Sequence, residues 1–221
     1  MRLNSVFNIL ATTILVLCAM VVTSILVRHE LVPSGSRTEP VFIENWRALL
    51  SGGHTVGDTS ALVYVIEFSD YQCPYCKTME PVIERVLKKY QGLVTLVRYD
   101  LPLRSHPHAL EAALAVECAS LQQRYDQYHD LLFEYPEHLN EGEWVRLALL
   151  AGVRDTARFR QCIRSNEQGR SVDHEINVAK RFAVQGTPTF VVNGFVLIGA
   201  VEEPVLESMI ERILSELRQG R

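Results

Sequence analysis

Residues Leu62–Cys76, with the sequence LVYVIEFSDYQCPYC, decide how this chain folds. Leu62–Phe68 is β-branched, aromatic or otherwise apolar except at Glu67, and this composition predicts a buried strand. A short polar turn follows, and a helical pattern begins directly after Cys73. Cys73 is therefore expected at the start of a helix, where unpaired backbone N–H groups and the positive end of the helix dipole stabilise a thiolate. Cys76 follows three residues later, close enough to form and break a disulfide with Cys73.

The Cys73–Cys76 pair has two other interpretations. A four-cysteine zinc site needs a second close pair, and the remaining cysteines, Cys18, Cys118 and Cys162, are isolated in the sequence. A purely structural disulfide within one helical turn would close a very small loop and stabilise little. We therefore expect thiol–disulfide exchange and no metal site.

The histidines do not change this expectation. His106 and His108 flank Pro107, while His129, His138 and His174 are scattered. No two of them have the i, i+4 spacing that would place them on one face of a helix. His106 or His108 could stabilise the thiolate from the rim of the site, or both could be solvated residues of a loop.

Length and charge limit the classes of protein that this chain can represent. Its 221 residues, 48% of them hydrophobic, can bury one good core with an inserted subdomain. The net charge is −4, and no block of Lys and Arg is interleaved with aromatic residues. We therefore expect no nucleic-acid partner.

The N-terminal segment is apolar enough to enter a membrane. Val6–Val27 contains no charged residue, and at about 1.5 Å per residue it reaches roughly 33 Å, enough to cross the hydrocarbon layer. We expect an uncleaved anchor. A cleaved signal is the alternative, because Val22–Ser24 is a passable cleavage site. Lipidation at Cys18 is less expected, since Leu17 stands where lipoprotein signals usually have a small residue.

The remaining sequence alternates between strand and helix patterns. Leu31–Pro40 reads as a tether, Phe42–Leu50 as a short helix and Gly52–Ser60 as a loop. An apolar stripe starting at Met79 predicts a helix after the two cysteines, and Leu93–Tyr99 predicts a second strand parallel to the first. Later helices are expected at Pro107–Leu121, Tyr125–Phe133, Trp144–Leu150, Thr156–Ile163 and Asp173–Phe182. A hairpin of Thr189–Asn193 and Phe195–Ile198 around Asn193-Gly194 and a helix over Pro204–Leu217 complete the order.

This order, together with Phe68–Cys76 (FSDYQCPYC) and Gly186–Phe190 (GTPTF), resembles the DsbA-like branch of the thioredoxin superfamily over residues 55–218. Cys-Pro-Tyr-Cys alone would equally suggest a glutaredoxin, but glutaredoxins lack the anchor and a helical insertion of this size. The resemblance implies an α/β thioredoxin fold with an inserted all-helical subdomain, preceded by an N-terminal transmembrane helix. The expected parts are an anchor or signal (1–28), a tether with a short helix (29–54), the first half of the thioredoxin fold (55–105), the helical insertion (106–184) and the second half (185–221).

The resemblance also implies roles for particular residues. The Thr187–Pro188 bond should be cis and face the dithiol, so that the backbone of Thr187 can pair with substrate. Glu67 should be a buried acid beneath Cys76 that relays a proton during exchange. Strand alternation places Glu67 with apolar neighbours, although it could instead face solvent or pair with Arg98.

Two further pairs of residues complete the expected site. Pro74 fixes the entry into the helix, and Tyr75 tunes the acidity of Cys73, the exposed attacking thiol that Cys76 later resolves. Cys118 and Cys162 are implied to form a second bridge inside the insertion, or else they are small core residues.

We therefore expect a thiol–disulfide oxidoreductase that acts on exported proteins as a disulfide donor. It would need no cofactor and would be recycled by a membrane redox partner. The N-terminal helix would hold it in the membrane with the catalytic domain on the extracytoplasmic side, because disulfides persist in oxidising compartments. The alternatives are a reductase or isomerase kept reduced by a membrane electron donor, a chaperone that binds clients without turnover, and a glutathione-dependent enzyme on the same fold.

Overall fold

The computed structural model describes residues 13–21, 23, 41–140 and 142–220. The chain divides into two compact units, Met1–Pro40 and Val41–Arg221. In the first unit, residues 13–21 are helical and their side chains are exposed. Within the described ranges, no helix combines the length and the apolar content needed to cross a bilayer. Much of the expected span Val6–Val27 lies outside the described residues.

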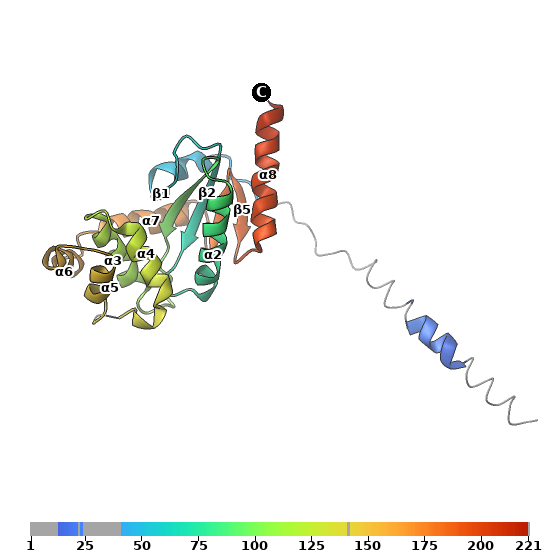
Figure 1. Ribbon diagram of the computed structural model, residues 1–221, viewed down its shortest axis with the longest axis horizontal. Coiled ribbons are helices and arrows are strands. Elements are labelled where there is room, and N and C mark those ends of the chain that lie inside the picture. The colour runs from blue at the N-terminus through green and yellow to red at the C-terminus, as the bar shows by residue number, and fades with distance from the viewer. Residues whose placement is uncertain (1–12, 22, 24–40, 141, 221) are drawn as a thin grey trace, which may run out of the picture. The chain divides into compact units, whose positions relative to one another are not determined.

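The second unit is built on a five-stranded mixed sheet with the order β1-β3-β2-β4-β5 (Figure 1). Its two central strands, β2 and β3, are parallel, as the sequence predicted. Every other neighbouring pair is antiparallel. The strands are β1 (His54–Val56), β2 (Val63–Ser69), β3 (Val94–Asp100), β4 (Thr189–Val192) and β5 (Phe195–Ile198).

Side chains of β2 alternate between the two faces of this sheet. Val63 and Val65 pack under helices α2 (Pro74–Lys89) and α8 (Glu203–Gln219). Ile66 and Phe68 point to the opposite core, which α7 (Gly169–Arg181) and the 3-10 helix η1 (Trp46–Ser51) cover. Because both faces of β2 are covered, the strand reads as a continuous apolar run.

Helix α2 has clear start and stop signals. Cys73 is its N-cap, and Pro74 occupies the first turn, where the missing N–H of proline costs nothing. Lys88 and Lys89 lie in the last turn and favour the negative end of the helix dipole. The helix continues through Pro81.

The chain between β3 and α7 forms a group of helices beside the sheet, away from α8 (Figure 1). These are α3 (Ala109–Ser120), α4 (Tyr125–Glu134), the 3-10 turn η2 (Pro136–His138), α5 (Trp144–Leu150) and α6 (Thr156–Arg164). Their apolar core also includes Tyr71, Cys73 and Cys76 from the sheet side. The expected thioredoxin fold with a helical insertion is thus confirmed, and the dithiol packs against the insertion.

Two expectations near the start of this unit were wrong. Gly52–Ser60 is not all loop, because β1 pairs antiparallel with β3 there. A three-residue strand is too short to show a period, and Gly53 allows a close backbone approach that a Cβ, 2.2 Å from the Arg98 carbonyl oxygen, would prevent. Phe42–Leu50 is not one helix, since Phe42 forms a β-bridge with Phe195 and only η1 is helical.

The hairpin of β4 and β5 turns where the sequence predicted. Asn193 and Gly194 both have positive φ, 45° and 102°, as a two-residue hairpin turn requires. Helix α7 begins at Gly169, four residues before the expected Asp173.

Candidate active site

The two thiols occupy the first turn of α2. Both Cys73 and Cys76 are free cysteines in this structure. The backbone N–H of Cys73 donates to the Asp70 carbonyl oxygen at 3.0 Å, and the N–H of Lys77 donates to the Cys73 carbonyl oxygen at 3.1 Å. These two bonds fix Cys73 between the turn and the helix, so its sulfur lies at the positive end of the helix dipole.

Cys73 is not the exposed thiol that we expected, since its residue is only 5% exposed. Its Sγ lies 3.4 Å from the Thr187 carbonyl oxygen, to which the thiol donates. On the other side it packs into the core of the insertion. Pro74 and Tyr75 are the solvent-facing residues of the motif, and Tyr75 is 64% exposed. A substrate must therefore reach a largely covered sulfur.

Sheet pairing brings the late Thr-Pro segment to this helix start. β4 runs antiparallel to β2, and Thr189 at the start of β4 pairs with Phe68 near the end of β2. The Thr187–Pro188 bond just before β4 is cis, as the resemblance implied. Segments 114 residues apart in sequence therefore meet at one sulfur.

Cys76 is completely buried beneath Cys73. Burial raises the pKa of the Cys76 thiol well above its ordinary value, although the polar side chains of Ser69 and Thr187 oppose that shift. Cys76 is therefore held as a neutral thiol when the pair is reduced. It needs a proton acceptor to attack and a proton donor when it leaves.

Glu67 is the buried acid that the sequence predicted, with no exposed surface. It shares a face of β2 with Ser69, a polar residue that opposes the rise in the pKa of Cys76. Burial, followed by the negative charge of Glu80, raises the pKa of Glu67 to about 8. Neither carboxyl oxygen of Glu67 has a hydrogen-bond partner among the described residues. This arrangement suits a group that takes up and releases a proton near neutral pH.

A cleft of about 570 Å³ opens beside Glu80 and Arg98, whose charges act on this buried acid. Glu80 and Arg98 reach it from the buried side, and carboxylates crowd its rim. Water in such a cleft can exchange protons with the buried charges. Its lining consists of Val56, Lys77, Glu80, Pro81, Glu84, Leu87, Arg98, Asp126, Asp130, Phe133 and Glu134.

His106 and His108 lie near the motif but contact its supporting loop rather than the sulfurs. The buried Asp70 accepts from the N–H groups of Gln72 and Leu103, each at 2.7 Å, and pairs with His106 Nδ1 at 2.9 Å. The backbone N–H of His108 donates to the side chain of Gln72 at 2.6 Å. These bonds hold the turn before Cys73 in place.

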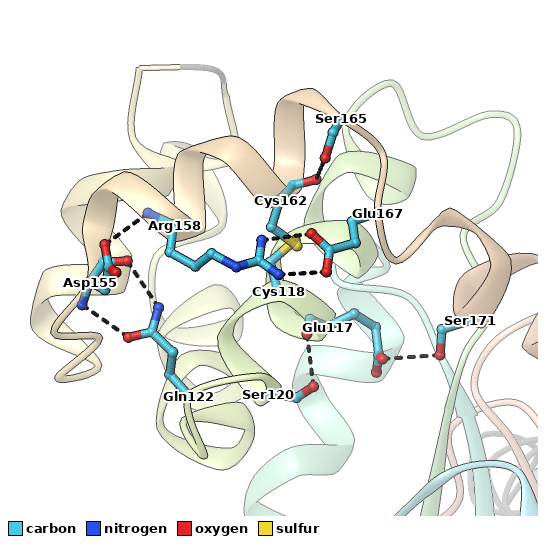
Figure 2. The surroundings of a disulfide bond; sticks show 10 residues. All are labelled: Glu117, Cys118, Ser120, Gln122, Asp155, Arg158, Cys162, Ser165, Glu167 and Ser171. Carbon is cyan, nitrogen blue, oxygen red and sulfur yellow. Dashed lines mark hydrogen bonds and ion pairs between the residues drawn. A yellow bond between two sulfur atoms is a disulfide. The ribbon is translucent and has the colours of Figure 1, made fainter.

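The insertion contains the disulfide between Cys118 and Cys162 that the resemblance implied. It joins α3 to α6, with 5.9 Å between the Cα atoms (Figure 2). The guanidinium of Arg158 donates to both carboxylate oxygens of Glu167 beside the bridge, at 2.5 and 2.6 Å. Figure 2 also shows the side chain of Gln122 bound to Asp155.

The sequence reading missed His129, which the structure places against the motif. The His129 ring is 1% exposed and contacts Tyr71 and Glu80. The available signal was its position in an apolar helical stripe with Tyr125, Leu132 and Phe133. No group of three or more possible metal ligands occurs in the described part of the chain.

Comparisons with known proteins agree with this geometry. A family model described as thioredoxin matches residues 50–212. The crystal structure of a thioredoxin-like oxidoreductase from Silicibacter pomeroyi superposes with a TM-score of 0.67 at 26% identity, covering 75% of this chain and 94% of that one. A probable disulfide bond formation protein D from Bacillus cereus is 27% identical over 178 residues, which cover 75% of this chain and 79% of that protein.

A second kind of relative is similar to this chain over only a small part of its own length. The Na(+)/H(+) antiporter NhaA 3 from Salinispora tropica is 36% identical over 145 residues. That match covers 64% of this chain but 22% of the antiporter. The chain thus spans about a fifth of the length of the curated antiporters it matches.

Proposed function

Because this chain belongs to the thioredoxin family and resembles its DsbA-like members, we propose that it is a thiol:disulfide oxidoreductase that donates disulfides to exported proteins. The observation that carries the proposal is the meeting of Cys73, at the N-terminus of α2, with the carbonyl of Thr187 before the cis-proline. A reactive sulfur and the backbone of Thr187 then lie side by side, where a substrate strand could be added.

In the proposed cycle, a substrate thiolate attacks the Sγ of Cys73 in the oxidised pair. A bond forms between substrate and Cys73, and Cys76 leaves with the electron pair of the broken bond. Glu67 supplies the proton that the departing Cys76 needs. A second substrate thiolate then attacks the mixed disulfide, which releases the oxidised substrate and leaves both cysteines reduced.

The protonation state of Glu67 suits the opening of the disulfide. With a pKa of about 8, Glu67 carries its proton at pH 7 and is ready to donate it. Reoxidation by a membrane partner, like the reaction of a reductase, uses the reverse step, in which Glu67 must first be ionised to accept the proton of Cys76. Pro74 fixes the helix entry, and the exposed Tyr75 is placed to contact substrate beside Cys73.

The same reasoning supports an extracytoplasmic location. The Cys118–Cys162 bridge suits an oxidising compartment. We further propose that Val6–Val27 anchors the protein in the membrane, and that a membrane redox partner restores the Cys73–Cys76 disulfide after each cycle. Residues 55–105 and 185–221 would form the catalytic fold and residues 106–184 the insertion.

The reduction potential of the Cys73–Cys76 couple tests the direction. A value near about −120 mV supports a disulfide donor, and one near about −270 mV supports the reductase alternative. Oxidation of a reduced peptide by the preoxidised chain tests the activity itself. A Cys73→Ala variant that kept all activity would overturn the proposal and favour a client-binding chaperone.

A further inference from the structure

His129 joins the helical insertion to both sides of the dithiol motif. It lies on α4, and its side chain is 1% exposed. Its Nδ1 lies 3.0 Å from the hydroxyl of Tyr71, two residues before Cys73. Its Nε2 lies 3.2 Å from Oε2 of Glu80, one helical turn after Cys76. The cycle described above gives this buried ring no role.

The two partners of His129 determine where its proton lies. A carboxylate only accepts hydrogen bonds, so Nε2 must carry the proton that faces Glu80. Nδ1 is then the acceptor for the hydroxyl of Tyr71. Burial, followed by the charge of Arg98, lowers the pKa of His129, which agrees with a neutral ring fixed in this one tautomer.

Glu80 is the acid to which this tautomer donates a hydrogen bond. Burial opposes its ionisation, but the hydrogen bond from His129, together with the charge and hydrogen bond of Arg98, holds the pKa of Glu80 below its ordinary value. The Nη2 of Arg98 lies 3.4 Å from the same Oε2. Glu67 has no comparable donor, since both its oxygens are unpartnered within the described chain.

The negative charge of Glu80 also raises the pKa of Glu67, so an ionised Glu80 favours the proton on Glu67. We propose that His129 is a positioning residue that keeps Glu80 ionised and so leaves the exchangeable proton on Glu67, where Cys76 can use it. The role of that proton rests on the proposed function. Without the donor on His129, the proton would pass toward Glu80, one turn too far along α2.

Charges and protons balance when the Cys73–Cys76 disulfide is opened. When substrate thiolate opens the disulfide, Cys76 leaves as a thiolate and takes the proton of Glu67. Glu67 becomes a carboxylate, and a proton from solvent later restores its acid form. His129 stays neutral throughout and only directs where that proton rests.

Other charged groups around His129 have other principal partners. From β1, His54 pairs with Asp126 at 3.2 Å and stacks on Tyr125. From its own helix, Asp130 faces the same cleft, and burial raises the pKa of that carboxyl. The groups that face His129 are Tyr71 from the turn after β2, Glu80 from α2, Arg98 from β3, and Tyr125, Asp126 and Asp130 from α4.

Titration of the two acids tests the proposal directly. The full chain is labelled with ¹³C at glutamate carboxyl carbons, and the signals are assigned with Glu67→Gln and Glu80→Gln. In His129→Phe, the titration midpoint of Glu80 should rise by about one to two pH units, the worth of a charge-assisted hydrogen bond. His129→Gln keeps an N–H near the position of Nε2 and should restore at least half of that shift. His174→Phe, at an exposed histidine of α7, is the matched control and should change neither midpoint.

An unchanged Glu80 midpoint in folded His129→Phe overturns the proposal. If that variant does not fold, the ¹⁵N spectrum of the His129 ring in the unaltered chain decides instead. A neutral ring protonated at Nε2 supports the proposal, and one protonated at Nδ1 overturns it.

These measurements do not depend on catalysis. A chain that shows the expected titrations but oxidises no reduced peptide would contradict the proposed function and leave the role of His129 in the network intact. A chain that oxidises peptide but whose His129 carries its proton on Nδ1 would contradict the role of His129 and leave the proposed function intact. In an active chain, His129→Phe should also slow the opening of the disulfide at pH 7, and His129→Gln should recover it.

Discussion

Glu67 and Arg98 stand opposite each other in the pairing of β2 with β3, yet the guanidinium of Arg98 donates to Glu80. An ion pair between the two strand residues would have kept Glu67 charged and unable to hold a proton at neutral pH. Because Arg98 turns to the helix instead, the buried carboxyl on β2 titrates near the pH at which exported proteins work.

Replacing Glu67 should remove one limb of the pH profile for disulfide opening. In the unaltered chain, the rate constant should fall about 10-fold or more above pH 8, as Glu67 loses the proton that Cys76 needs. In Glu67→Gln the rate should be low throughout and flat across this range. Stopped-flow measurement with preoxidised protein and a substrate thiol of low pKa isolates the step. A Glu67→Gln profile that matched the unaltered one would rule out the relay.

The same carboxyl should make stability depend on pH. The pKa of Glu67 is about 8 in the folded chain and near its ordinary value of 4.5 when unfolded, so the folded state holds a proton that the unfolded state has released. The contribution of Glu67 to stability is therefore present below pH 4.5 and is lost as pH rises through 8. Relative to Glu67→Gln, the unaltered chain should lose roughly 2–4 kcal/mol between pH 5 and 8.5. Urea unfolding at both pH values measures this, and equal losses in the two proteins would contradict it.

The two thiols should have separable roles. Cys76→Ala should still react through Cys73 but accumulate a mixed disulfide with substrate, because the resolving sulfur is missing. Cys73→Ala should form no such adduct, because Cys76 is completely buried. Mass spectrometry of acid-quenched reactions distinguishes the two. Abundant adducts at Cys76 in the Cys73→Ala variant would mean that the attacking sulfur has been misassigned.

The bridge in the insertion should matter for stability. The Cys118→Ala/Cys162→Ala double variant should lose roughly 2–4 kcal/mol of unfolding free energy, because the bridge closes a long loop across 44 residues. Denaturant unfolding measures the loss. Cys18→Ala, at an exposed cysteine outside the catalytic unit, is the control and should leave stability unchanged.

Much of this fold could be predicted from the sequence because its strongest patterns are local. The apolar run of β2, the stripe of α2 and the Asn193-Gly194 turn each specify their own element. β1 could not be predicted from the sequence. Its three half-buried residues show no alternation of side chains, and they form a strand only by pairing with β3, about forty residues later. The short helix before it was overestimated, because Phe42 is held by a distant hairpin strand.

The candidate site divides along the same line. Cys73 and Cys76 are three residues apart in sequence and Glu67 lies on the preceding strand, so pattern alone located them. His129 acts across 49 residues on Glu80, and no local pattern links the two. The burial of Cys73 likewise follows from a carbonyl 114 residues away.

The apolar core of the insertion contains Tyr71, Cys73 and Cys76 as well as its own helices. Removing the insertion to make a minimal protein would therefore uncover both sulfurs. Grafting the dithiol onto a smaller protein would have the same effect. In the truncated protein, water would reach Cys76, and the pKa of that thiol would fall toward its ordinary value. The helices between the two halves of the sheet are thus part of the active site, because they cover its two sulfurs.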